Sequence, residues 1–348
     1  MSLILRYPLH MVWAVTNLCN AHCVHCSSSA GCRLPGELDT KEALGLIDQL
    51  AELGVVDLAL SGGEALLRPD IDELISHAVK RNMQVGLGTN GWWIQKERAH
   101  ELKRLGLHRV QISLDGLGPV HDQVRGLPGL FERATAAMHA CREAGLQTHV
   151  CFTPHRDNVQ DLEHVIQFAY EQGIHLFNLS QFVPVGRGSQ AMDLSAEKWK
   201  EIARLWAKKR REYAGRMKFT SHLAQMALVD SSLARQEAFR GCQAGTGQGY
   251  IAPDGTVTPC VMLPVGIGNV KDKPFREIWD ESSVISDLRD RSNLGGKCGS
   301  CRIRERCGGC RGVAYGYYQT HMAEDPHCWL PPEAAQAKER IDSGLLAT

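Results

Sequence analysis

The chain has 348 residues, of which 43% are hydrophobic and 22% charged, as in globular proteins with an apolar core. Lysine plus arginine equals aspartate plus glutamate at 39 each, so no basic excess points to nucleic acid or a membrane surface. No stretch approaches the roughly 20 apolar residues of a membrane span, and the N-terminus lacks a signal-peptide pattern. We therefore expect about two domains, a cytoplasmic location, and no nucleic-acid or membrane partner.

Short β-rich runs alternate with helical patterns over residues 11–182. We expect strands at 11–16, 55–61, 84–89, 109–114, 148–153 and 176–182, and helices at 40–53, 71–81, 95–105, 130–144 and 159–172. This alternation predicts a parallel sheet with helices outside it, closed as a barrel or left open. In both cases the C-terminal ends of the strands would form the site.

The pattern changes in the last third of the chain. Residues 195–213 predict one further helix, with Leu194, Ile202, Leu205 and Trp206 on its apolar side. From about residue 240, glycines and cysteines become dense and the alternation stops, which is typical of a small domain organised around metal. We expect domains at 8–215 and 240–330, with their boundary between 215 and 240, and a tail at 331–348.

Thirteen cysteines are unusual for a cytoplasmic chain, where clustered cysteines more often bind metal than form disulfides. The first cluster, Cys19, Cys23 and Cys26, directly follows the first expected strand. Three thiolates in one short loop suit an iron–sulfur cluster with one open iron. A zinc site completed by His22 or His25 is the alternative.

Three further motifs end the next expected strands: Ser61-Gly62-Gly63-Glu64, Thr89-Asn90-Gly91, and Ser113-Leu114-Asp115-Gly116. Together with the cysteine spacing, they resemble the radical S-adenosylmethionine (AdoMet) family. The resemblance implies a partial (β/α)6 TIM-like barrel and a [4Fe-4S] cluster on Cys19, Cys23 and Cys26. It also implies residues that contact AdoMet: Gly62, Gly63, Glu64, Asn90, Ser113, Asp115 and Arg125. Arg125 is alternatively a solvated surface charge, and Phe182 could flank the adenine or simply pack in the core.

The second cysteine group runs from Cys242 to Cys328 and resembles the SPASM domain, which holds two auxiliary iron–sulfur clusters. The resemblance assigns one cluster to Cys298, Cys301, Cys307 and Cys328, and the other to Cys242, Cys260 and Cys310. The chain departs from the family in two ways: the interval Cys307–Cys310 is one residue short, and residues 236–241 contain no cysteine. The second cluster would therefore have an open or non-cysteine position. A zinc ribbon on Cys298, Cys301, Cys307 and Cys310 would leave three cysteines without a role.

Three cysteines lie outside both groups. Cys141 and Cys151 fall on a helical and a strand pattern, so we expect them in the core. Cys32 follows the first cysteine group and is interpreted as an ordinary loop residue, with a hydrogen-atom donor or spare ligand as the alternative.

The resemblance implies an enzyme in which AdoMet is cleaved to a 5′-deoxyadenosyl radical that abstracts hydrogen from a large biosynthetic precursor. The strings at 183–188, 307–311 and 323–328 are similar to enzymes that decarboxylate or remove tetrapyrrole side chains in haem biosynthesis. With the first strand expected near residue 11, there is also no room before it for a leader-peptide-binding module. The alternative is a maturase that crosslinks, epimerises or decarboxylates a ribosomally synthesised peptide. A non-enzymatic electron carrier is disfavoured, because it needs no AdoMet pocket.

Two partners are implied. One is the tetrapyrrole or peptide substrate, for which His22, His25 and His155 are candidate ligands if the substrate carries a metal. The other is a reducing electron donor of the flavodoxin or ferredoxin type. The sequence identifies no catalytic side chain.

Overall fold

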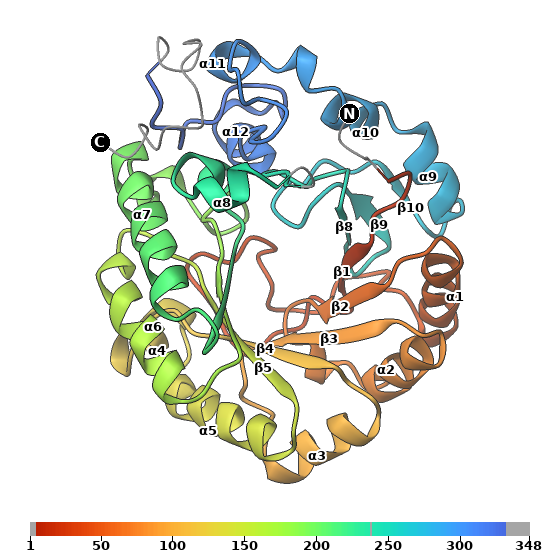
Figure 1. The fold of residues 1–348 in the computed structure, drawn as a ribbon. Helices are drawn as coiled ribbons and strands as arrows, with labels where there is room; N and C mark the ends of the chain where they lie inside the picture. Colours follow the sequence, from red (N-terminus) through yellow and green to blue (C-terminus); the bar gives the residue numbers. More distant parts are fainter. Residues whose placement is uncertain (1–4, 237–238, 332–348) are drawn as a thin grey trace.

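The computed structural model describes residues 5–236 and 239–331, which form one twisted sheet surrounded by helices (Figure 1). The sheet has ten strands in the order β10-β9-β8-β1-β2-β3-β4-β5-β6-β7. Their bounds are β1 His10–Ala14, β2 Asp57–Ser61, β3 Gln84–Thr89, β4 Arg109–Ser113, β5 Gln147–Phe152, β6 Leu176–Leu179, β7 Lys218–Ser221, β8 Gln248–Ile251, β9 Thr256–Thr258 and β10 Gly268–Asn269.

Strands β1 to β7 are all parallel, with helices between them, as the alternation predicts. The helices are α1 Thr40–Glu52, α2 Ile71–Lys80, α3 Lys96–Arg104, α4 Pro119–Arg125, α5 Leu130–Glu143, α6 Leu162–Glu171, α7 Ala196–Glu212, α8 Ser231–Ala234, α9 Phe275–Glu281, α10 Ser283–Arg289, α11 Gly296–Gly299 and α12 Arg311–Tyr318. Short 3₁₀ turns lie at Ala65–Leu67, Val159–Asp161, Gln190–Met192, Ala224–Leu228 and Arg291–Asn293. Among the strands that the structure describes, β7 pairs only with β6, so the sheet is a partial barrel and not a closed one.

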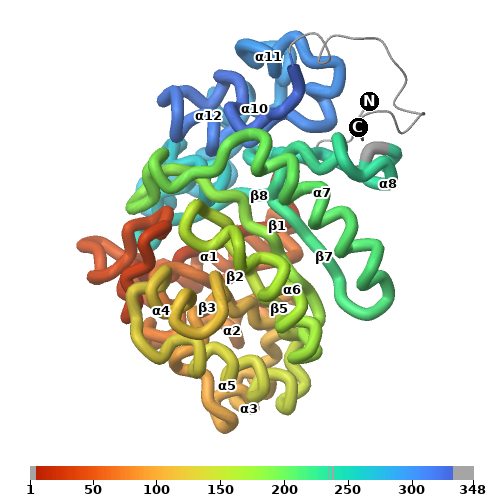
Figure 2. Tube along the Cα trace, turned by 90° about the vertical axis from the view of Figure 1, so that its left-hand side faces the viewer, coloured from red at the N-terminus to blue at the C-terminus, as the bar shows by residue number. Residues whose placement is uncertain are grey.

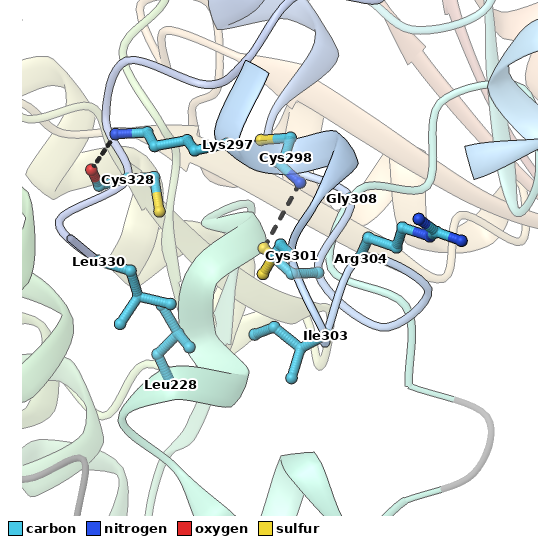
Figure 3. Close-up of a pocket in the computed structure, with 11 residues that line it drawn as sticks. Leu228, Lys297, Cys298, Cys301, Ile303, Arg304, Gly308, Cys328 and Leu330 are labelled. Atoms are coloured by element: carbon cyan, nitrogen blue, oxygen red, sulfur yellow. Dashed lines mark hydrogen bonds between the residues drawn. The ribbon is translucent and has the colours of Figure 1, made fainter. Parts of the chain in front are cut away.

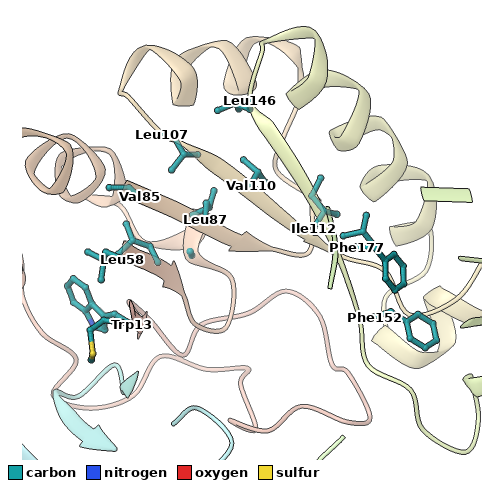
Figure 4. Packing of buried hydrophobic residues seen from close by; sticks show 14 of the residues in the cluster. Trp13, Leu58, Val85, Leu87, Leu107, Val110, Ile112, Leu146, Phe152 and Phe177 are labelled. Carbon is teal, nitrogen blue, oxygen red and sulfur yellow. The ribbon is translucent and has the colours of Figure 1, made fainter. Parts of the chain in front are cut away.

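The core lies between the sheet and the helices that cover its outer face (Figure 4). Because successive strand residues point to opposite faces, alternate positions such as Leu58, Val110 and Phe152 are buried against the helices. Helix α1 shows how the sequence builds this layer. Asp39 accepts from the Glu42 backbone N–H at 2.8 Å while Glu42 accepts from the Asp39 N–H at 2.9 Å, a capping box that starts the helix.

Before the cysteine-rich part, three differences from the predicted elements bear on the site. Strand β6 ends at Leu179, so residues 180–182 are buried but irregular. Strand β7 adds a parallel strand beyond β6, and its four residues are too few to show a period in the sequence. Helix α4 was not predicted because it spans only seven residues, yet it carries Arg125 at its last position.

The cysteine-rich part continues the same sheet. Strand β8 pairs with β1 in parallel, and β9 and β10 add to it in antiparallel fashion. Ile251, Val257, Phe275 and Trp279 belong to the same hydrophobic core as the barrel. Figures 1 and 2 both place α10, α11 and α12 together at one end of the molecule, away from α3 and α5.

The predicted division into domains at 8–215 and 240–330 stays a prediction, and residues 332–348 of the predicted tail lie outside the described residues. The predicted helix at 195–213 is present as α7, where Trp199, Ile202 and Trp206 are buried. Within residues 5–236 and 239–331, no helix has both the length and the apolar character needed to cross a membrane.

Candidate active site

The cysteine loop, residues 19–31, follows β1 and is closed at its base by the backbone. Cys19 N–H donates to Gly31 O at 3.0 Å and Gly31 N–H donates to Asn17 O at 2.9 Å. Cys23 is buried, while Cys19 and Cys26 are partly exposed. The three thiols that the spacing brings together are therefore carried by one short, closed loop at the C-terminal edge of the sheet.

Two charged side chains without a predicted role, Glu37 and Arg187, hold this loop. Glu37 anchors its base, accepting from Asn17 N at 2.8 Å and from Thr16 Oγ1 at 2.9 Å. Arg187 spans its middle, donating from Nε to Cys23 O at 2.8 Å and from Nη1 to Ala30 O at 2.7 Å. The only sequence signal for Arg187 is its place in the string at 183–188. That string resembles known enzymes but does not indicate which atoms Arg187 contacts.

Gly62 and Gly63 bring the end of β2 against residues 16–18, the segment that leads into the cysteine loop. A Cβ at Gly62 would lie 2.3 Å from Thr16 O, and one at Gly63 would lie 2.3 Å from Leu18 O. In the same contact, Gly63 N–H donates to Thr16 O at 2.7 Å. These glycines are thus required for close approach of two backbones.

Glu64 connects β2 with β3 at the same edge. It is fully buried, and its carboxylate accepts from Thr89 Oγ1 and from Asn90 N, each at 2.8 Å. Burial raises the pKa of Glu64 and outweighs the hydrogen bonds from Asn90 and Thr89, which lower it. Asn90 in turn donates from Nδ2 to Asn20 Oδ1 at 2.8 Å, so the chain of contacts returns to the cysteine loop.

Asp115 forms the centre of a buried ion pair beyond β4. Its Oδ2 lies 2.5 Å from Arg125 Nη2 and 3.3 Å from His25 Nε2, and its Oδ1 accepts from Thr153 N at 2.7 Å. Burial opposes the ionised form, but Arg125 and His25 outweigh it and hold the pKa of Asp115 far below its usual range. Ser113 ends β4 just before this residue.

Arg125 connects that ion pair to the cysteine loop. Its Nη1 lies 3.7 Å from Cys23 Sγ while its Nη2 binds Asp115. Its side chain is only 12% exposed, which excludes the alternative of a solvated surface charge. One guanidinium therefore faces both a carboxylate and a predicted cluster ligand.

Several buried polar atoms around these residues have no hydrogen-bond partner within the described part of the chain: Asn20 Nδ2, His25 Nδ1, Arg125 Nε and His155 Nε2. Buried polar atoms are normally satisfied, so a set of unpaired ones at one place indicates a polar ligand. The rings of His25 and His155 are 5.4 Å apart, and Phe182 lies 6.2 Å from His155. A zwitterionic nucleoside such as AdoMet fits these donors and acceptors.

The second cysteine group lies in the C-terminal part of the chain and forms two sets. Cys298, Cys301, Cys307 and Cys328 line one pocket (Figure 3), together with apolar Leu228, Ile303 and Leu330. These are the four cysteines that the resemblance assigns to one cluster.

The remaining three cysteines of this group also lie near one another. Cys242 and Cys260 both pack against the same small cluster of buried side chains. Burial is the main cause that raises the pKa of Cys310, and the neighbouring Cys242, Asp325 and Cys260 add to it in that order. Cys260 Sγ accepts from Gln248 Nε2 at 3.0 Å, and Cys242 N–H donates to Cys307 O at 3.0 Å. The two sets are therefore adjacent.

Single-ion zinc sites receive no support. In the residues described, no three His, Cys, Asp or Glu side chains are gathered closely enough to hold one metal ion. His22 is exposed, and His25 Nε2 faces Asp115. A cluster larger than one ion suits thiols that line a pocket without converging on a point.

Outside both groups, Cys141 is fully buried on α5, as predicted. Cys151 on β5 is only partly buried and lies 3.5 Å from Asn178 Nδ2. Cys32 is exposed.

Comparison with known proteins places these features in a family. Residues 13–169 match the model of the radical SAM superfamily, and residues 242–310 match SPASM, an iron–sulfur cluster-binding domain. The AdoMet-dependent heme synthase of Methanosarcina barkeri is 33% identical over 339 residues, covering 93% of this chain and 97% of that protein. A mycofactocin maturase of Mycobacterium tuberculosis is 34% identical over 350 residues, covering 96% and 86%. The crystal structure of Streptococcus suis SuiB bound to S-adenosylmethionine shares the fold, with a TM-score of 0.76 at 18% identity over 94% of this chain and 78% of that one.

Proposed function

This chain belongs to the radical SAM superfamily and carries a SPASM domain, and from that premise we propose that it processes the side chains of a tetrapyrrole. It is an enzyme that uses AdoMet with a [4Fe-4S] cluster and auxiliary iron–sulfur clusters. When bound, these groups supply a 5′-deoxyadenosyl radical capable of abstracting hydrogen from an unactivated carbon.

For the first cluster we propose Cys19, Cys23 and Cys26 as ligands. The closed loop and the Arg187 contacts support this assignment, because both hold the three thiols in one orientation. Arg125 would hold Cys23 by its contact to Sγ, and Asp115 would keep that guanidinium in place.

For AdoMet we propose the buried surroundings of this loop: Gly62, Gly63, Glu64, Asn90, Ser113, Asp115 and Arg125. The unpaired polar atoms at Asn20, His25, Arg125 and His155 support a polar ligand here. The glycines would act by closing β2 onto the loop, and Glu64 and Asn90 by fixing the end of β3 beside it.

For the auxiliary clusters we propose two ligand sets: Cys298, Cys301, Cys307 and Cys328, and separately Cys242, Cys260 and Cys310. The cysteine-lined pocket supports the first set. The effect of Cys242 and Cys260 on the pKa of Cys310 supports the second set, because it requires the three thiols to lie near one another.

The tetrapyrrole proposal depends on one observation above all: the heme synthase relative matches this chain over nearly the whole length of both proteins. The reaction we propose is side-chain decarboxylation or removal. For a propionate, the 5′-deoxyadenosyl radical would take one hydrogen atom and become 5′-deoxyadenosine. The side chain would then lose carbon dioxide, and one electron would pass to an oxidised auxiliary cluster, which leaves a vinyl group. A deeply buried site would exclude water while such a carbon radical exists.

The second candidate is maturation of a ribosomally synthesised peptide. The mycofactocin maturase supports it, because its identity to this chain is as high as that of the heme synthase.

Incubation of the reconstituted chain with AdoMet, dithionite and an iron porphyrin carrying propionates tests the proposal under anaerobic conditions. We expect 5′-deoxyadenosine and a porphyrin that has lost carbon dioxide. The variant Cys19→Ala/Cys23→Ala/Cys26→Ala should form neither product, whereas Cys32→Ala, which removes an exposed cysteine outside the proposed ligands, should form both. 5′-Deoxyadenosine with an unchanged porphyrin would transfer support to the peptide candidate.

We further propose a flavodoxin- or ferredoxin-type donor as the natural reductant and a cytoplasmic location. None of the thirteen cysteines, all of which lie in the described part of the chain, forms a disulfide, and a reducing compartment maintains cysteines in this state.

A further inference from the structure

Asp325 lies between the two cysteine sets of the C-terminal part. It follows α12 in the loop that leads to Cys328, and it is fully buried. Its backbone N–H donates to Cys298 Sγ at 3.3 Å, and its Oδ2 accepts from Cys310 N at 2.6 Å. One residue therefore contacts a member of each proposed ligand set directly.

The carboxylate of Asp325 receives three N–H donors. Besides Cys310 N, Oδ2 accepts from Gln225 Nε2 at 2.6 Å, and Oδ1 accepts from His327 N at 2.9 Å. His327 immediately precedes Cys328. Because donors face both oxygens, the position requires a group that only accepts, and an asparagine would turn its NH₂ against one of them.

Gly309 and Arg311 pack tightly around Asp325, so the two cysteine sets cannot move independently of each other. Gly309 has φ +61°, and a Cβ there would lie 2.8 Å from Asp325 Cβ and 3.2 Å from Cys298 Sγ. Arg311 donates from Nη1 to His321 O and Ala323 O, and its Nη2 lies 3.9 Å from Cys298 Sγ. The turn at 307–310 and the loop at 321–328 are thus packed as one unit.

We propose that Asp325 is a positioning residue shared by both auxiliary clusters, fixing their ligands relative to each other and setting both reduction potentials. The inference rests on the ligand sets proposed above. A negative charge beside two clusters disfavours adding an electron to either of them. Its removal should therefore raise both midpoint potentials, and the loss of its hydrogen bonds should loosen both ligand sets.

The test uses the full-length chain with Cys19, Cys23 and Cys26 replaced by alanine, so that only auxiliary clusters remain. The parent is expected to bind about eight iron atoms, as two [4Fe-4S] clusters require. Asp325→Asn is then compared with it by iron content, redox titration and electron paramagnetic resonance. We expect both clusters to respond together, by a rise of both midpoint potentials or by loss of iron from both sites.

Asp193→Asn is the matched control. Asp193 is also buried, and its Oδ2 lies 2.6 Å from His327 Nε2 in the same loop and accepts from Tyr317 OH at 2.9 Å. Neither of these two partners is a proposed cluster ligand. Its variant should leave both potentials at the parent values. A response of only one cluster to Asp325→Asn, no response, or an equal response to Asp193→Asn would each overturn the proposal.

If Asp325→Asn fails to fold by circular dichroism, Gln225→Leu replaces it. This change removes one donor to Oδ2 and leaves the charge less compensated, so both potentials should fall. A shift at one cluster alone, or at neither, would overturn the proposal. A parent that binds only about four iron atoms would instead contradict the assignment of two auxiliary clusters.

Discussion

Replacing Asp115 with asparagine should destabilise the protein strongly. The carboxylate is fully buried and 2.5 Å from Arg125 Nη2, and the guanidinium is itself only 12% exposed. Asparagine can still accept from Thr153 N, so the main loss is the charge opposite Arg125. Removing one partner of a buried ion pair costs roughly 3–5 kcal/mol, because the other charge remains buried without compensation. We therefore expect Asp115→Asn to lower the free energy of unfolding by about 3 kcal/mol or more.

Urea unfolding of the cluster-free, reduced chain, followed by far-ultraviolet circular dichroism, measures this difference. Asp280→Asn is the control, because it breaks an Arg6–Asp280 pair in which Arg6 is 71% exposed, and exposed pairs contribute about 0–1 kcal/mol. The double variant Asp115→Asn/Arg125→Met removes the buried charge as well, so it should recover much of the loss. If Asp115→Asn lies within about 1 kcal/mol of the control, or the double variant is no better than the single one, the ion-pair argument is wrong.

Three further changes test the surroundings of the cysteines. Arg187→Met removes two hydrogen bonds to the cysteine loop and should speed the release of iron from the first cluster to a chelator. Arg33→Met changes a side chain that is 63% exposed and should leave this rate unchanged. Equal rates for the two variants would contradict the role of Arg187. Gly309→Ala should cost about 2 kcal/mol or more of unfolding free energy through left-handed strain and contact with Asp325, against about 1 kcal/mol for Gly215→Ala, where φ is +77° and the space is open. Burial opposes ionisation of Glu37, but the backbone donors of Asn17 and Leu34 prevail and lower its pKa. The ionised carboxylate therefore stabilises the fold fully above the unfolded pKa of about 4.3, and this stabilisation is lost as pH falls through the lower folded pKa. Glu37→Gln should make the free energy of unfolding fall less steeply in acid, and an unchanged pH profile would refute this.

The sequence could predict the parts of the fold whose signals are local. Hydrophobic periodicity and glycines at helix ends predicted β1 to β6 and most of the helices between them, because the buried face of each element shows in its own sequence. Strand β7 and helix α4 were not predicted, because they are too short to show a period and are stabilised by tertiary contacts. Strand β8 was not predicted for a different reason, since its partner β1 lies more than two hundred positions away.

The cysteine spacing together with the motifs that end the strands indicated the family and its chemistry, because each of these signals lies within one short stretch of sequence. What surrounds the thiols is visible only in the folded chain. Arg125 and Arg187 reach the cysteine loop from segments distant in sequence, and Asp325 joins two cysteine sets through both its amide and its carboxylate. Such contacts depend on how parallel strands bring their C-terminal ends to one edge and on how a late loop packs against an earlier turn. No local pattern encodes that packing, since it results from burial summed over the whole chain.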